Sequence, residues 1–126
     1  MASMESCWEL ADVRLSTVRC GEQMVFVNLR FGQENHNDTS NDSCLFSAVI
    51  KAIARATDIE LSLIQFNVRQ VNDHEVEVHA TIRSNGQLTI VTGIDNDIIS
   101  AFAKVVVAAV NRSLEKNKTP GFIPGC

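Results

Sequence analysis

Val76-Glu77-Val78-His79-Ala80-Thr81-Ile82-Arg83-Ser84-Asn85-Gly86-Gln87-Leu88-Thr89-Ile90-Val91-Thr92 is the stretch that decides the fold of this chain. Apolar and polar side chains alternate on both sides of Asn85-Gly86, and this period is typical of half-buried β-strands. Asn-Gly favours a type I′ turn because both of its residues tolerate positive φ. The stretch therefore predicts a β-hairpin with strands over 76–83 and 88–92.

The segments on either side extend this hairpin into a larger unit. Residues 64–71 alternate in the same way and predict a preceding strand. Gly93 is expected to break the chain after the hairpin, and Asp95 to cap a helix over about 96–115. This helix is apolar on more than one face, through Val107, Ala108 and Ala109. We expect it to pack both on its own sheet and on a second subunit.

The same plan occurs a second time in the chain. When the sequence is shifted by 53 positions, Val25, Val27 and Leu29 fall on Val78, Ala80 and Ile82, and the order of strand and helix signals is kept. The first copy predicts strands over 8–18 and 24–31 and a helix over about 43–56, capped by Asn41 or Asp42. Its third segment, 33–42, is polar and rich in turn formers, so it predicts either an exposed edge strand or a mobile loop.

These patterns predict an α+β fold of two pseudo-symmetric βββα units, with antiparallel strands and the helices packed on one face. The whole chain, 1–126, is expected to form one domain. Its repeat units cover about 8–57 and 62–114, and an irregular tail covers 115–126.

Composition and charge narrow the possible functions. The net charge is −4, which argues against nucleic-acid and anionic-membrane partners. The N-terminus does not resemble a secretory signal, so we expect a cytoplasmic protein. The four cysteines, Cys7, Cys20, Cys44 and Cys126, lie far apart without metal-site spacing and predict free thiols. We expect no metal and no cofactor.

No arrangement of residues in the sequence points to catalysis, so the chain alone is not expected to be an enzyme. The two predicted helix starts suggest a binding site instead. A helix N-terminus attracts a carboxylate, an aspartate can hold an ammonium group, and Phe46, Ile94 and Ile98 could enclose an aliphatic side chain. These features suit a free amino acid, although simple helix capping explains Asp95 and Asp97 equally well. A reactive thiolate at Cys44 is a further alternative.

A family resemblance gives the amino-acid hypothesis more content. Gly93-Ile94-Asp95-Asn96-Asp97-Ile98-Ile99-Ser100-Ala101-Phe102-Ala103-Lys104, followed by Ala108-Ala109-Val110-Asn111-Arg112, resembles the C-terminal regulatory, leucine-binding domain of the alpha-isopropylmalate synthase and citramalate synthase family. Phe46–Thr57 is similar to that family's first regulatory helix. The resemblance covers roughly residues 8–114.

The resemblance implies a homodimer that binds the pathway end-product, leucine or isoleucine, as an allosteric inhibitor. The parent enzyme would be an acyl-CoA-dependent 2-isopropylmalate synthase-type transferase. The candidate effector-binding residues are Asp42, Ser43, Cys44, Phe46, Gly93, Ile94, Asp95, Asp97 and Ile98. The family's glycine-rich turn before the first helix is replaced here by Asp42-Ser43-Cys44-Leu45. This departure motivates an alternative function, a dimerisation module that has lost its effector site.

Overall fold

Two βββα units form the chain, as the repeat predicts. The computed structural model describes residues 7–19, 22–42 and 44–116. The elements follow in the order β1 (Trp8–Arg19), β2 (Glu22–Phe31), β3 (Glu34–Asp42), α1 (Leu45–Thr57), β4 (Leu61–Gln70), β5 (Val76–Ser84), β6 (Gln87–Asp95) and α2 (Ile98–Lys116). The predicted α+β class is confirmed. The helix α2 continues through Lys116, into the tail expected at 115–126, and residues 117–126 lie outside the described part.

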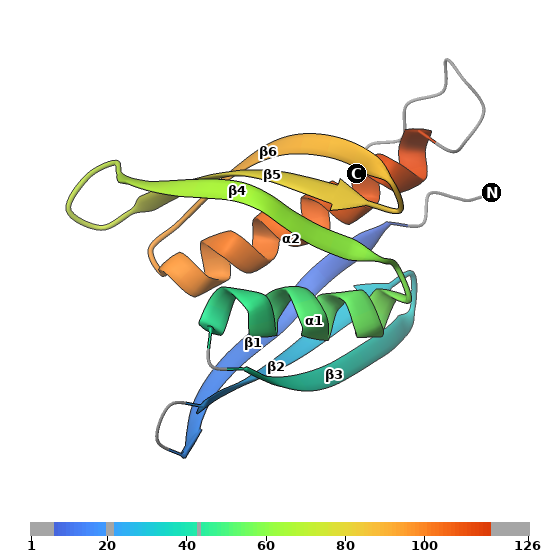
Figure 1. Ribbon diagram of the computed structural model, residues 1–126, viewed down its shortest axis with the longest axis horizontal. Coiled ribbons are helices and arrows are strands. Elements are labelled where there is room, and N and C mark those ends of the chain that lie inside the picture. The colour runs from blue at the N-terminus through green and yellow to red at the C-terminus, as the bar shows by residue number, and fades with distance from the viewer. Residues whose placement is uncertain (1–6, 20–21, 43, 117–126) are drawn as a thin grey trace.

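The two sheets lie on the outside of the molecule with both helices between them (Figure 1). Each sheet has three antiparallel strands, in the orders β1-β2-β3 and β4-β5-β6. The helix α1 packs on β2 and β3, and α2 packs on β5 and β6. Each helix also contacts the first strand of the other sheet, α1 against β4 and α2 against β1. The two units are therefore interlocked rather than merely joined end to end.

The repeat extends to irregular features of the backbone. The β1–β2 ladder shifts register between Leu10 and Asp12, and the β4–β5 ladder shifts between Leu63 and Gln65, 53 positions later. Such a bulge increases the local twist of the strand. The predicted Asn-Gly hairpin is confirmed, with φ of 49° at Asn85 and 85° at Gly86. The matching turn in the first unit has positive φ at Gly32 (64°), the first of its two turn residues, and this pattern is that of a type II′ turn.

The polar segment of the first unit is an edge strand, which was one of its two predicted structures. From Gln23 paired with Asp42 to Phe31 paired with Glu34, β3 follows β2 without interruption. The helix α1 supports this strand, since the Arg55 guanidinium donates to the carbonyl of Thr39 at 2.9 Å. Backbone pairing with β2 and this contact with Arg55 hold β3 in place, although β3 lacks the apolar side chains of the equivalent strand β6.

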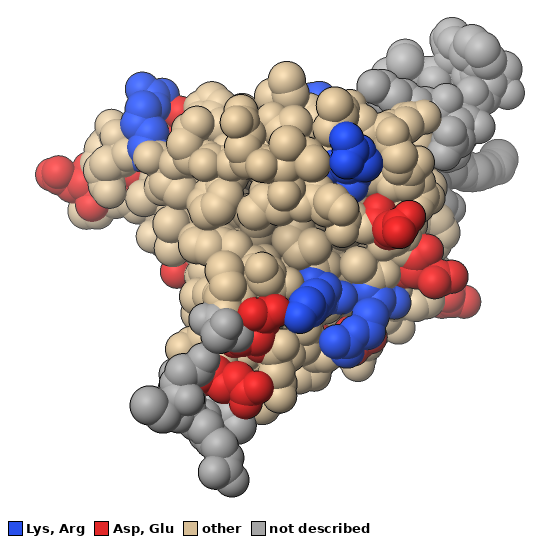
Figure 2. Space-filling view, in the orientation of Figure 1, with Lys and Arg blue, Asp and Glu red and all other residues tan. Residues whose placement is uncertain are grey.

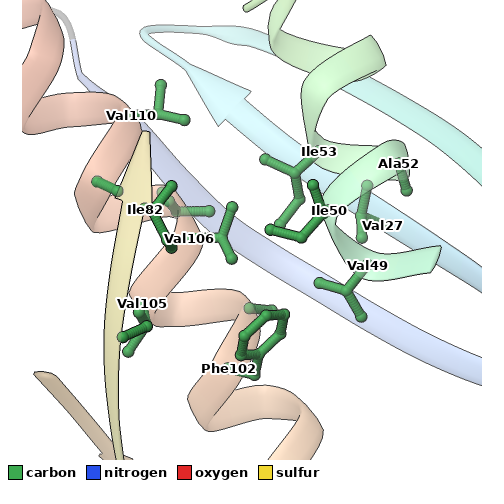
Figure 3. Close-up of a cluster of buried hydrophobic side chains, with 14 of the residues drawn as sticks. Val27, Val49, Ile50, Ala52, Ile53, Ile82, Phe102, Val105, Val106 and Val110 are labelled. Atoms are coloured by element: carbon green, nitrogen blue, oxygen red, sulfur yellow. The ribbon is translucent and has the colours of Figure 1, made fainter. Parts of the chain in front are cut away.

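The core lies where the two helices meet between the sheets. Val27 from β2 and Ile82 from β5 lie on either side of residues from both helices, including Ile53 and Val106 (Figure 3). The side chains that are completely buried include Val25, Val27, Leu29, Val49, Ile53, Val78, Ile82, Phe102, Val105, Val106 and Val110. This burial supplies most of the driving force for folding.

The wide apolar face of α2 is covered within the chain. Val106 and Val110 are fully buried, and α2 contacts β1 and α1 of the first unit. Packing within the chain therefore accounts for most of the apolar breadth of this helix, and its contact with a second subunit stays a prediction. The first unit of the same chain, through β1 and α1, covers the side of α2 that does not face its own sheet.

Candidate functional site

The two helix starts are equivalent and lie at the same end of the molecule (Figure 1). An Asp42 carboxylate oxygen accepts the Cys44 N–H at 3.0 Å, and the other is 2.5 Å from Lys51 Nζ. In the second unit, Asp95 accepts the N–H of residue 97 at 3.3 Å and lies 2.6 Å from Lys104 Nζ. The same turn and the same aspartate–lysine pair thus recur 53 positions apart.

Both helices are capped two positions after the predicted aspartates, Asp42 and Asp95. The N-cap of α1 is Cys44, not Asn41 or Asp42. In α2 the cap is Asp97, not Asp95, because the Asp97 carboxylate accepts the Ser100 N–H at 2.9 Å and its carbonyl accepts the Ala101 N–H. The reason is that the preceding strands run as far as Asp42 and Asp95, so each helix begins later than its sequence pattern suggests.

The sequence predicted that Gly93 breaks the chain after the hairpin, and this prediction is wrong. It lies inside β6, paired with Val78. A Cβ atom at this position would be 2.8 Å from Val105 Cγ2 and 3.2 Å from the Ala101 carbonyl oxygen. The glycine therefore permits α2 to pack closely on its own sheet.

Three phenylalanine rings lie between the helix starts. Phe46, in the first turn of α1, has its ring centroid 4.9 Å from that of Phe102 on α2. Phe66 on β4 completes the group, at 4.6 Å from Phe46 and 5.4 Å from Phe102. The rings are tilted or edge-on, which is the favourable arrangement for aromatic pairs. Phe46 thus contributes to packing between the two units.

An open depression lies beside the start of α2. Its volume is about 520 Å³, and it is bordered by the β4–β5 turn and by the junction of β6 with α2. The lining residues are Asn72, His74, Glu75, Ile94, Asp95, Asn96 and Lys104. The hydrogen bond from Lys104 lowers the pKa of the Asp95 carboxyl below its ordinary value, so this side chain is ionised at neutral pH. The depression therefore presents both signs of charge next to an exposed isoleucine.

The structure divides the predicted effector residues into separate groups. Ile94 and Asp95 line the depression, and Asp97 caps the adjacent helix. Gly93 and Ile98 pack toward the core of the second unit. The remaining candidates, Asp42, Cys44 and Phe46, belong to the start of α1, and Ser43 lies outside the described residues.

Cys44 is exposed, and it is a free thiol. Hydrogen bonding from Ser47 lowers the pKa of this thiol, although no side-chain hydrogen bond caps the helix there. The expectation of free thiols is confirmed for Cys44 and is wrong for Cys7, which is disulfide-bonded.

Within residues 7–19, 22–42 and 44–116, no group of three or more His, Cys, Asp or Glu side chains is placed to hold a metal ion. In the same part of the chain, the helices are too short or too polar to cross a membrane.

Comparison with known proteins assigns this arrangement to a family. Residues 1–114 match the family described as the LeuA allosteric (dimerisation) domain. The chain belongs to this family. It is 28% identical over 107 residues to the 2-isopropylmalate synthase of Aquifex aeolicus (strain VF5), an alignment that covers 80% of the chain. It is 29% identical over 117 residues, 90% of the chain, to the 2-isopropylmalate synthase of Ruthia magnifica subsp. Calyptogena magnifica.

This LeuA allosteric (dimerisation) domain is much shorter than the curated relatives that it matches. The alignments cover 21% of the length of each of those two synthases. The resemblance deduced from the sequence is therefore confirmed at the level of the family and of the domain.

Five residues that line the depression were not among the predicted site residues: Asn72, His74, Glu75, Asn96 and Lys104. The repeat contained a signal for Lys104, because the spacing Asp42 to Lys51 recurs as Asp95 to Lys104. Asn96 follows Asp95 directly in the sequence, whereas Asn72, His74 and Glu75 lie on the β4–β5 turn, and only the folding of that turn back toward β6 brings them to the site.

Proposed function

We propose that this chain is the amino-acid-sensing regulatory domain of a cytoplasmic 2-isopropylmalate synthase-type enzyme, and that it works as a homodimer. The effector is a free branched-chain amino acid, leucine or isoleucine. The observation that carries the proposal is the depression beside α2, where the predicted residues Ile94 and Asp95 lie with Lys104 and Glu75. Membership of an allosteric domain family supports the same function.

The chemistry of the depression suits an amino-acid zwitterion. Carboxylates of Glu75 and Asp95 can accept hydrogen bonds from an ammonium group, and the Lys104 ammonium can donate to a carboxylate. The side chain of Ile94, 44% exposed, offers an apolar surface to an aliphatic group. A ligand that carries both charges and an aliphatic side chain uses all three features.

The second unit is the better candidate for the site. The end of β6 and the start of α2 retain Gly93, Asp95 and Asp97, which match the family pattern, whereas the first unit has Asp42-Ser43-Cys44-Leu45 in place of the family's glycine-rich turn. A glycine-rich turn allows a ligand to approach the backbone closely, and side chains at those positions restrict that approach.

Thermal unfolding with added amino acids tests the proposal. Leucine, isoleucine, valine and methionine are compared with glycine, which has the same charged groups but no aliphatic side chain. A ligand at 100 times its dissociation constant should stabilise the folded state by about 2.7 kcal/mol if it binds only that state. No stabilisation by any aliphatic amino acid at millimolar concentration would contradict effector binding.

The repeat supplies a matched pair of variants for the same assay. Asp95→Asn and Asp42→Asn each remove a carboxylate from an aspartate–lysine pair and an equivalent turn. We expect Asp95→Asn to abolish the ligand-induced shift and Asp42→Asn to retain it. Loss of the shift only in Asp42→Asn would place the site in the first unit.

A dimerisation module without an effector is the second candidate function. The observation that favours it is the contact among Phe46, Phe66 and Phe102, whose rings occupy the space between the helix starts. This function predicts a dimer in sedimentation experiments together with a flat response to every amino acid. A monomer at micromolar concentration would eliminate it.

A further inference from the structure

An exposed apolar stripe runs along the outer face of β6. Leu88, Ile90 and Ile94 are 53%, 69% and 44% exposed, whereas Thr89 and Val91 between them are buried. Alternation along a strand places the first three on the face that points away from the helices. Isolated exposed apolar residues are ordinary, but Leu88 and Ile90 are successive on one strand face, and Ile94 follows on the same face after the exposed Thr92.

The strand β6 also lies at the open edge of its sheet. It pairs only with β5 in the sheet order β4-β5-β6. The carbonyl of Ile90 faces away from β5, since it accepts a hydrogen bond from Arg112 of α2 at 3.0 Å. Edge strands that remain in solvent are usually protected by charged residues or proline. From Gln87 to Ile94, β6 contains neither.

The equivalent edge strand of the first unit is protected in this way. At the positions of Leu88, Ile90 and Ile94, β3 has Asn35, Asn37 and Asn41. It also carries Glu34, Asp38 and Asp42. The two units therefore share a fold but differ on their outer faces, and only the second presents an apolar edge.

The space-filling view agrees with this difference. Acidic and basic residues gather over α1 and β3, whereas the surface over β4–β6 is largely uncharged between its two ends (Figure 2). The least charged region of this view thus coincides with the second unit.

We propose that the outer face of β6 is the surface on which a second copy of this chain packs, with Ile90 near the two-fold axis. The inference rests on the proposed homodimer and adds the location of its interface. A second copy is the occupant that fits, because the family is one of dimerisation domains and because a closed dimer uses the same patch on both copies. The apolar side chains of the stripe can meet their own copies without burying polar groups, whereas the outer face of β3 would bury the amides of Asn35, Asn37 and Asn41.

Sedimentation of a matched pair of variants tests this assignment. Ile90→Glu places one negative charge from each copy close to the axis, and Asn37→Glu places the same charge at the equivalent position of the first unit. We expect Ile90→Glu to raise the dimer dissociation constant at least about 100-fold, since two like charges would be desolvated together. Asn37→Glu should retain the dissociation constant of the parent chain.

The outcomes separate an error in the location of the interface from an error in the proposal that the chain is a homodimer. If the parent chain and Ile90→Glu dimerise equally well, the location is wrong while the proposed homodimer stands. If the parent chain is a monomer throughout the micromolar range, both proposals fail. Equal weakening by Asn37→Glu would also overturn the assignment. Circular dichroism checks folding, and if Ile90→Glu is unfolded, Ile90→Ser replaces it, with an expected loss of at least about 10-fold from removal of the buried aliphatic group.

Discussion

At the scale of single residues, Gly93 fixes how closely α2 approaches its sheet. A Cβ at this position would be 2.8 Å from Val105 Cγ2, and Val105 is fully buried and has little room to move. We expect Gly93→Ala to reduce the free energy of unfolding by about 1–3 kcal/mol through overpacking. Urea denaturation measures the change as a lower midpoint with an unchanged slope.

The first unit again provides the control for this experiment. Ser40 occupies the position equivalent to Gly93 and already accommodates a side chain there, 2% exposed. Ser40→Ala keeps the Cβ and should change the midpoint much less than Gly93→Ala. Equal stability of Gly93→Ala and the parent chain would show that α2 can shift away at little cost.

Asp95 should make stability depend on pH in the acidic range. Its carboxyl pKa is lowered in the folded state, chiefly by the hydrogen bond from Lys104. The stabilising contribution is therefore complete above the ordinary aspartate pKa of about 4 and is lost as the pH falls through the lowered folded value. Asp95→Asn should be less stable than the parent at pH 7, by no more than about 1 kcal/mol for so exposed a pair.

The stability difference between Asp95→Asn and the parent should then close as the pH falls below about 4. Denaturation midpoints collected across this range measure it. Lys104→Met tests the cause, because removal of the cation should flatten the same part of the pH profile. A gap that stays constant down to the acid limit would contradict the assigned ion pair.

The capping residues show where sequence reasoning stops at this scale. Composition identified both acidic turns, but it could not tell Asp95 from Asp97 as the cap of α2. That choice depends on the pairing of Val76 with Asp95, which keeps the strand going until the residue before the turn. The end of a strand depends on the neighbouring strand with which it pairs, and a local sequence pattern does not identify that neighbouring strand.

At the scale of elements, the two hairpins use different turns for the same task. Gly32 has a φ of 64°, which an L-residue other than glycine adopts only with strain. We expect Gly32→Ala to lower the free energy of unfolding by about 1 kcal/mol. The double variant Gly32→Asn with Gln33→Gly introduces the Asn-Gly pair of the second unit and should recover most of this loss. Urea midpoints of the three chains measure the effect, and equal stability of Gly32→Ala and the parent would contradict it.

The strand β3 was difficult to predict for a physical reason. Its side chains are polar and typical of turns, yet its backbone pairs with β2 along its whole length. Backbone hydrogen bonds do not depend on side-chain polarity, so an edge strand can form from a sequence with low strand propensity. The supporting contact comes from Arg55, and the equivalent residue in the second unit is Ala108, so the repeat gave no hint of it.

At the scale of the whole molecule, the pattern of each unit was easier to predict than the relation between the units. The apolar breadth of α2 correctly indicated a helix covered on two sides, but the sequence did not say that β1 and α1 provide the second cover. The depression has the same character, because it joins the β4–β5 turn to the start of α2. Contacts between distant segments are determined by packing, and the hydrophobic periodicity of the sequence indicates only which faces of each helix or strand are buried.

Asn111 makes the connection between the units specific. Its side-chain oxygen accepts the Trp8 N–H at 2.8 Å, and its amide nitrogen donates to the Trp8 carbonyl at 2.9 Å. The helix of the second unit therefore holds the first strand of the first unit as a neighbouring strand would. This gives a structural role to the Asn111 of the family-like motif in α2.

We expect Asn111→Ala to reduce the free energy of unfolding by about 1–3 kcal/mol, because both Trp8 backbone groups lose partners in a partly buried place. Trp8, the single tryptophan, reports on the contact by fluorescence, and far-UV circular dichroism reports on the whole chain. In the parent the two transitions should coincide, since the interlocked units unfold together. In Asn111→Ala both should move to lower urea, whereas Asn67→Ala, which removes an exposed amide on β4, should leave them in place. An unchanged midpoint in Asn111→Ala would mean that burial between the units, without this polar contact, is sufficient to couple them.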